Sequence, residues 1–263
     1  MDIVPQYTFI PLAYKNYFNI NDKETQNLFN KWGLKGNIVL QHFSFNEPFH
    51  LYHKYQFAEA FFKSSIVAEN LLTKRGSSWT KQGIIASTVD VQQIPCSVIN
   101  MSFFNKLENP DNGIINSSGV IRKRYDSEIN DFLISDKLRE MLLDEESTQY
   151  DLYTEDERKE FIFCIFQMLV LGGILCQYED TLKPYLDTTK RIYKDLIRVQ
   201  KRKYSDDLCV STTVLKVTAK DNKNQAYFPS NNPFNIQNVG FLLIDGNLRE
   251  ITTFLHQFGG YCD

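Results

Sequence analysis

Residues 161–171 read Phe-Ile-Phe-Cys-Ile-Phe-Gln-Met-Leu-Val-Leu. Apolar side chains fill nearly every position, so a helix made of this stretch has no face for water and should be buried all round. Upstream, Thr154 and Glu157 fit a capping box. Downstream, Gly172 stands where a left-handed residue ends a helix. We therefore predict a helix over Thr154–Leu171 at the centre of the core.

Periodicity and capping residues predict further helices on both sides of this stretch. Ser64 and Ser65 are candidates to break and cap the second of them, and Ser135 is the expected N-cap of the third. In the fourth, Pro184 suits the first turn, and an apolar stripe recurs at helical spacing. The predicted helices are Lys23–Trp32, Lys54–Leu72, Ser135–Leu143 and Pro184–Val199.

Strand signals lie towards the two ends of the chain and are rich in β-branched and aromatic residues. Asp221–Asn224 and Asp245-Gly246-Asn247 are turn formers, and the second predicts a hairpin. The predicted strands are Asn37–Phe45, Gly83–Val91, Leu208–Ala219, Val239–Ile244 and Arg249–Leu255. The fold class is therefore α+β, with central buried helices packed against mainly antiparallel strands from both chain ends.

The domain organisation follows from length and turn content. A chain of 263 residues suits one large domain or two small ones. Turn formers crowd residues 108–131. We predict one α+β domain over 1–263, with 1–107 and 132–263 as candidate lobes joined by that segment.

Composition narrows the function classes. Hydrophobic residues make up 43% and charged residues 23%, which is typical of a globular protein. The net charge of −3 argues against a dedicated nucleic-acid binder. The five cysteines are widely spaced without a CxxC pair, which favours reduced thiols over a disulfide scaffold. With no signal-peptide pattern at the N-terminus and no apolar run long enough for a bilayer, we expect a soluble intracellular protein without membrane insertion.

Motifs of common enzymes are not found. The sequence holds no Gly-rich dinucleotide fingerprint, no phosphate-binding loop, no nucleophile elbow and no His-Glu-x-x-His helix. We therefore predict a protein that is not an enzyme, with no catalytic residues and no cofactor.

Two sets of residues are weaker candidates, one for a metal site and one for a reactive thiol. His50-x-x-His53 offers two imidazoles, with His42 or Glu47 as a third ligand. Surface or half-buried histidines beside an aromatic segment are the favoured interpretation, and no metal is predicted. Cys176 and His256 can be paired as nucleophile and base, but an inert thiol is favoured.

An aromatic segment runs from Phe43 to Phe62 and could stack nucleic-acid bases. Only Lys54 and Lys63 add positive charge to it, so core packing is favoured.

Charge is distributed unevenly along the chain. Residues 144–160 hold eight acids and two bases, and Lys190–Lys203 holds seven bases and one acid. The alternatives are two solvated faces, two faces that complement each other, or an interaction surface. For the third, Arg191, Lys194 and Arg198 are the candidate partner-binding residues. We expect an internal acidic counterpart for Lys190, from 144–160, and an external one for Arg191 and Arg198.

Several short stretches of sequence, in the same order, resemble stretches of the cilia- and flagella-associated protein 300 family. Pro95-Cys96 and Met101-Ser102-Phe103-Phe104 are among them, and the strongest is Leu171-Gly172-Gly173-x-Leu175-Cys176-Gln177-Tyr178-Glu179-Asp180. Others are Phe57-x-x-Ala60-Phe61-Phe62-Lys63, Phe132-Leu133-Ile134-Ser135-Asp136-x-Leu138-Arg139, and the run from Pro184 to Leu196. The resemblance covers about Phe43 to Ala219.

The resemblance implies a non-catalytic protein of the cytoplasm and motile cilium. Such a protein serves the assembly or transport of outer and inner axonemal dynein arms. Its implied partners are axonemal dynein subunits or chaperone cofactors of the PIH-domain type, and no catalytic residue is carried over. A permanent structural component of the axoneme and an enzyme without a recognisable motif are the alternatives.

Overall fold

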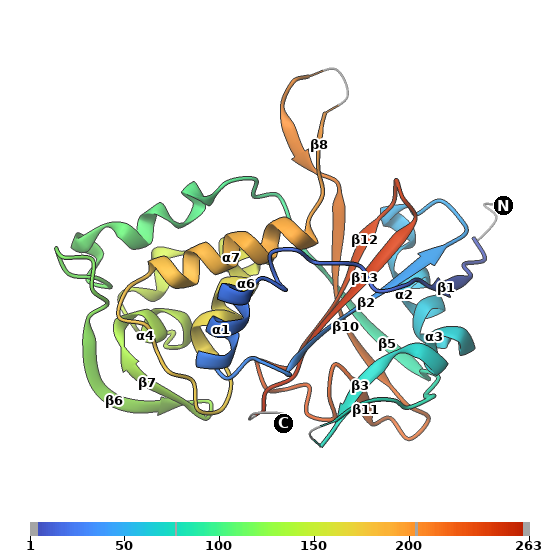
Figure 1. Ribbon diagram of the computed structural model, residues 1–263, viewed down its shortest axis with the longest axis horizontal. Helices are drawn as coiled ribbons and strands as arrows, with labels where there is room; N and C mark the ends of the chain where they lie inside the picture. The colour runs from blue at the N-terminus through green and yellow to red at the C-terminus, as the bar shows by residue number, and fades with distance from the viewer. Residues whose placement is uncertain (1–4, 77, 203–204, 260–263) are drawn as a thin grey trace.

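The computed structural model describes residues 5–76, 78–202 and 205–259. An antiparallel seven-stranded sheet runs through it (Figure 1). In spatial order the main strands are β1 (Phe9–Pro11), β2 (Ile38–Phe45), β13 (Glu250–His256), β12 (Val239–Asp245) and β10 (Thr212–Lys220). Two more strands pair with β10, namely β5 (Thr88–Ile94) and the short β11 (Ala226–Phe228).

The two ends of the chain meet in the middle of this sheet. Strand β2 lies beside β13, with Leu40 opposite Phe254 and His42 opposite Thr252. The predicted α+β class, with antiparallel strands from both chain ends, is confirmed.

Side chains alternate between the two faces of the sheet, as the pleat requires. Phe241 and Leu243 of β12 face one core cluster, while Leu242 and Ile244 face the other. Both faces are therefore apolar and both need a cover.

Helices cover both faces (Figure 1). The first face carries α1 (Lys23–Lys31), α4 (Lys137–Leu143), α5 (Glu155–Lys159), α6 (Phe161–Leu171) and α7 (Lys183–Leu196), with the 3-10 segments Met101–Glu108, Pro110–Asn112 and Tyr150–Leu152 and the hairpin β6–β7 (Lys123–Ile129, Phe132–Asp136). The second carries α2 (Lys54–Lys63) and α3 (Ser65–Asn70), with the 3-10 turn Leu51–His53 and the hairpin β3–β4 (Leu72–Arg75, Ser78–Lys81).

Helix α6 is the centre of the first cluster, as predicted. Phe161, Phe163 and Phe166 are fully buried. The ring of Phe161 meets Phe241 of the sheet edge-on at 5.2 Å, and Phe166 lies 4.8 Å from Phe104.

The single helix predicted over Thr154–Leu171 is wrong, because the chain leaves helical geometry at Glu160. The Glu160 carboxylate accepts hydrogen bonds from the amide and the hydroxyl of Ser97, and the Phe161 amide donates to the Pro95 carbonyl at 2.8 Å. These long-range bonds replace the helical ones. The capping box of Thr154 and Glu157 is present at the start of α5.

Caps and helix ends agree with the sequence in part. Ser64 separates α2 from α3 and caps α3, as expected. The N-cap of α4 is Asp136 rather than Ser135, because the Asp136 carboxylate accepts the Arg139 amide at 2.9 Å while Ser135 still belongs to β7. Helix α7 ends at Leu196 rather than Val199, since Val199 has entered a strand.

Two predicted strands shift for reasons of pairing. Strand β5 begins at Thr88 rather than at Gly83, because its pairing with β10 begins with Thr88 opposite Lys220. The segment Leu208–Ala219 is divided at Ser211, whose amide donates to the Arg198 carbonyl at 2.9 Å, into β9 (Leu208–Val210) and β10. The turns at Asp221–Asn224 and at Asp245-Gly246-Asn247 join strands as predicted.

Gly172 ends α6 with a φ of +65°, although its ψ of −164° lies outside the left-handed helical region. A Cβ at this position would lie 2.4 Å from the Cys176 sulfur and 2.6 Å from the Trp32 carbonyl oxygen. The close approach of α1 to this turn therefore requires glycine.

Candidate functional site

Helix α7 presents two different faces. Tyr185, Ile192 and Leu196 are buried, and the opposite side carries Lys190 and Lys194, both exposed. The amphipathic pattern of the sequence thus places these ammonium groups four residues apart on one side of the helix.

Arg191 has an internal counterpart, contrary to expectation. Its guanidinium contacts Glu24 at 2.6 Å and Asp22 at 3.5 Å, both at the start of α1. Asp22 is also the N-cap of α1. Arg191 therefore joins α7 to the positive end of a neighbouring helix through acids that already belong there.

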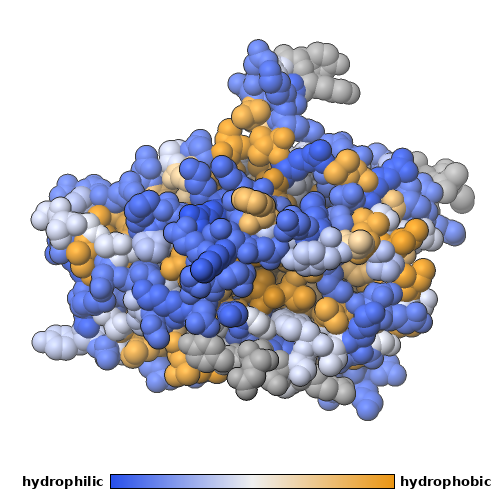
Figure 2. All heavy atoms as spheres, in the orientation of Figure 1, coloured by the Kyte–Doolittle hydropathy of each residue, from blue (hydrophilic) through white to orange (hydrophobic). Residues whose placement is uncertain are grey.

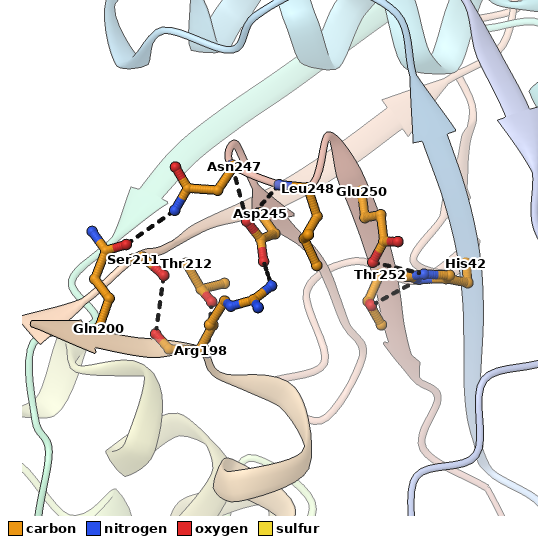
Figure 3. A network of polar contacts seen from close by, with 10 residues as sticks. All are labelled: His42, Arg198, Gln200, Ser211, Thr212, Asp245, Asn247, Leu248, Glu250 and Thr252. Carbon is orange, nitrogen blue, oxygen red and sulfur yellow. Dashed lines mark hydrogen bonds and ion pairs between the residues drawn. The ribbon is translucent and has the colours of Figure 1, made fainter.

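Arg198 likewise has an internal counterpart. Its Nη1 lies 2.8 Å from Oδ2 of Asp245, at the β12–β13 turn (Figure 3). Burial alone would raise the pKa of Asp245, but hydrogen bonds from Arg198 and from the Leu248 and Asn247 amides lower it. The Arg198 amide also donates to the Thr212 hydroxyl at 2.9 Å.

Among the described residues, Lys190 lacks the internal acidic counterpart that was expected for it. Among residues 5–76, 78–202 and 205–259, neither Lys190 nor Lys194 forms an ion pair or a side-chain hydrogen bond. The acidic segment instead serves other groups: Glu157 binds Lys106 at 2.7 Å and Glu155 binds Lys159 at 2.5 Å. An internal counterpart of Lys190 in residues 144–160 is therefore a wrong prediction.

Directly after α7, the chain forms a projecting hairpin, here called the arm. It consists of β8 (Val199–Lys201) paired antiparallel with β9 (Leu208–Val210). The arm stands out from the body at the end of α7 (Figure 1). Lys203, the last base of the predicted cluster, lies outside the described residues.

The two faces of the arm differ. Residues directly opposite in an antiparallel pair share a face, so Gln200 and Cys209 share one, and Val199, Lys201, Leu208 and Val210 share the other. Gln200 accepts a hydrogen bond from Asn247 at 3.0 Å, which turns its face to the β12–β13 turn (Figure 3).

The face turned away from that β-turn carries exposed apolar side chains beside Lys201. Val199 is 41% exposed and Leu208 is 51% exposed. Hydrophobic side chains gather where the arm meets the body, above a hydrophilic surface (Figure 2). We call the exposed set Lys190, Lys194, Val199, Arg202 and Leu208 the α7–arm surface.

The histidines do not converge. His42 contacts Glu250 at 3.2 Å and Thr252 at 3.3 Å, and burial lowers its pKa. His50 stacks on Tyr52 with ring centres 5.1 Å apart. In the part of the chain that the structure describes, no group of three or more His, Cys, Asp or Glu side chains is placed to hold a metal.

In the described part of the chain, no hydrogen bond joins Cys176 to His256. Burial raises the pKa of the Cys176 thiol to about 11, which keeps it protonated at neutral pH. Burial lowers the pKa of His256 to about 4, and its Nδ1 donates to the Gln237 carbonyl at 2.6 Å.

The aromatic segment packs into the second core, as favoured. Phe43, Phe57 and Phe61 are almost fully buried. Phe61 meets Phe43 edge-on at 5.2 Å. Tyr52 and Tyr55 are exposed.

Sequence reasoning missed the buried Arg139. Its guanidinium contacts Asp136 at 2.5 Å, the Val170 carbonyl at 2.6 Å and the Tyr185 hydroxyl at 2.9 Å. The signal was present in Asp136-x-x-Arg139, an acid at the N-cap and a base three residues further on, before the apolar run Met141-Leu142-Leu143.

A cavity of about 700 Å³ lies beside β11 and the loop that follows it. Amide side chains line much of it: Gln82, Gln225, Asn231, Asn232, Asn235, Asn238 and Gln257. Among the residues that the structure describes, its lining contains no cysteine or histidine.

Among the described residues, none of the helices combines the length and the apolar character needed to cross a membrane.

Comparison with known proteins gives a consistent result. The model of the family described as cilia- and flagella-associated protein 300 matches residues 6–256. A protein of that name from Paramecium tetraurelia is 31% identical over 242 residues, which cover 91% of this chain and 89% of the relative. One from Chlamydomonas reinhardtii is 28% identical over 256 residues, covering 96% and 98%. No solved structure matches the chain. With the family matched along almost its whole length, the chain belongs to the cilia- and flagella-associated protein 300 family.

Proposed function

We propose that this protein is a non-catalytic factor for the assembly or transport of outer and inner axonemal dynein arms, needed for the motility of the cilium. Its membership of a cilia- and flagella-associated family supports this role. It works in the cytoplasm, where dynein arms are put together, and in the motile cilium, where they are delivered.

The observation that carries a partner-binding role is the pair Lys190 and Lys194. Both are exposed at i and i+4, and neither has a partner among the described side chains. Like charges at this spacing cost a helix a few tenths of a kcal/mol, about 0.2–0.5. An acidic surface on another protein would remove that cost.

Arg191, Lys194 and Arg198 take different parts in the proposal. Lys194 contacts the partner directly. Arg191 and Arg198 hold α7 to α1 and to the β12–β13 turn through their ion pairs. The partners are axonemal dynein subunits or chaperone cofactors of the PIH-domain type.

The test uses a ciliated or flagellated cell that lacks its own copy. Rescue is compared for the unchanged protein, for Lys190→Glu/Lys194→Glu, and for Lys35→Glu/Lys223→Glu as a control at exposed lysines elsewhere. We expect both dynein arms to be missing from axonemes of unrescued cells in electron micrographs. The control should restore them, and the α7 variant should restore them poorly.

Normal arms in unrescued cells would contradict the proposal. A protein that stays on isolated axonemes after high-salt extraction would instead favour a permanent structural component. Normal rescue by the α7 variant would remove the helix from the binding surface and leave the assembly role standing.

A further inference from the structure

We propose that the α7–arm surface binds an extended acidic segment of a partner protein that also carries apolar side chains. This deepens the proposed function, on which it rests, by naming the chemistry of the segment that is bound.

Several bases on this surface have no acidic partner among the described residues. Every described acid between α7 and β9 already accepts an internal bond: Asp187 from Lys183, Asp195 from Asn19 and the Ile20 amide, Asp206 from Lys201, Asp207 from Ser205, and Asp245 on the adjoining turn from Arg198. The bases Lys190, Lys194 and Arg202 form no ion pair or side-chain hydrogen bond in the described ranges. The three unpaired bases outnumber Asp195 and Asp207, whose hydrogen-bond donors are neutral, so the net charge available to a partner is positive, although the whole chain carries −3.

The arm exposes apolar side chains on one face. Val199 and Leu208 share a face that is turned away from the β12–β13 turn. On the same face, Val210 packs against the first core. Lys201, opposite Leu208, pairs with Asp206. The apolar strip therefore begins at the core and continues outward into solvent, beside the end of the basic helix.

Hydrogen bonds and an ion pair fix the corner between α7 and the arm. Arg198 sits at this corner, and its side chain, amide and carbonyl are each bonded, to Asp245, Thr212 and Ser211 respectively (Figure 3). Gln200 adds a bond to Asn247. The backbone segments that carry the lysines and the apolar side chains are thereby joined in a fixed arrangement before binding, which lowers the ordering cost on this side of the interface.

Together these features specify the partner. Carboxylates would lie along the lysines of α7, and an apolar side chain would cover Val199 and Leu208. Charge would speed the encounter, and apolar burial would slow dissociation. Nucleic acid offers phosphates and base faces, which stack on aromatic rings, but no aliphatic side chain to cover Val199 and Leu208.

The test measures binding of defined probes to the full chain by fluorescence anisotropy. One probe is a synthetic peptide of glutamates with interspersed leucines, the second has serine in place of each leucine, and the third is a single-stranded oligonucleotide. We expect the leucine peptide to bind about tenfold more tightly than the serine peptide. Leu208→Ser should remove that difference, whereas Leu133→Ser, at a leucine of similar exposure, should preserve it.

Lys190→Glu/Lys194→Glu should abolish binding of both peptides, and Lys35→Glu/Lys223→Glu should leave it unchanged. Thermal unfolding of each variant establishes that the fold is intact. The proposal is overturned by binding of neither peptide, by equal binding of both, or by a preference for the oligonucleotide. Those outcomes leave the dynein-arm phenotype of the preceding section untouched, so the two proposals can fail separately.

Discussion

The guanidinium carbon of Arg139 lies 3.3 Å from the centre of the Tyr178 ring, while the same group pairs with the fully buried carboxylate of Asp136. Asp136, the Tyr178 ring, the Tyr185 hydroxyl and the Val170 carbonyl thus surround this buried arginine, whose Nε has no hydrogen-bond partner among the described residues. Tyr178 belongs to the stretch 171–180, on which the family resemblance chiefly rested. Part of that stretch therefore helps to bury a charged group in the core.

Replacement of Arg139 by Met should lower the free energy of unfolding by about 3–5 kcal/mol, because the Asp136 charge stays buried without its partner. Urea unfolding measures the loss. Arg202→Met, at an exposed and unpaired arginine, is the control and should change stability by no more than about 0.5 kcal/mol. Adding Asp136→Asn to Arg139→Met should restore part of the loss, and a double variant that is worse than the single one would refute this account.

The phenylalanines of α6 should be among the most costly to truncate. Phe163→Ala or Phe166→Ala should cost about 3–5 kcal/mol through lost contacts and the cavity left behind. Phe234→Ala, where the side chain is 95% exposed, is the matched control and should be nearly neutral. An unchanged midpoint of unfolding for both core variants would show that α6 is peripheral.

The Arg198–Asp245 pair should couple weakly and depend on pH. A double-mutant cycle with Arg198→Ala and Asp245→Ala should give about 0.2–1 kcal/mol at neutral pH, because both groups keep contact with solvent. The folded pKa of Asp245 is depressed, so this contribution is fully present above the unfolded pKa of about 3.9 and is lost as the pH falls through the folded value. A coupling that grows on acidification would have the wrong sign.

The cysteines are predicted to be unpaired with one another. Labelling after denaturation should count five thiols. In the native protein near neutral pH, Cys164 and Cys176 should react slowly, because burial raises the pKa of each thiol to about 11. Three or fewer thiols in protein prepared without reductant would reveal a disulfide. Fast native labelling of Cys164 would show that α6 opens readily.

Elemental analysis tests the prediction that the protein carries no structural metal. Purified protein should contain far less than one metal ion per chain, because His42 is engaged by Glu250 and Thr252 rather than by His50 or His53. One zinc per chain that survives dialysis would bring these histidines back as ligands.

Local signals in the sequence were sufficient for local structure. The apolar run of α6, the Ser64 cap and the capping box at Thr154 each depend on residues a few positions apart, and each is present. The break at Glu160 depends on Ser97, and the end of α7 is fixed by Thr212. No periodicity within the helix itself contains such information.

The candidate site shows the same division. The basic cluster was visible in sequence, but its division into paired and unpaired groups was not. Arg191 finds its acids in α1, and Arg198 finds its acid at the β12–β13 turn, both far along the chain. The arm was also missed, because Leu208–Val210 reads as the start of a longer strand until Ser211 bonds to Arg198.

The pairing of β2 with β13 has a consequence for biosynthesis. Strand β2 leaves the ribosome about 210 residues before its neighbour β13, since His42 pairs with Thr252. Closing so long a stretch of chain is slow, and until then the nascent protein exposes an open strand edge and the apolar side chains of two cores. We therefore expect the chain to be prone to aggregation until β13 has been made. A premature stop codon that removes β13 would eliminate the folded protein, however much of the chain precedes it.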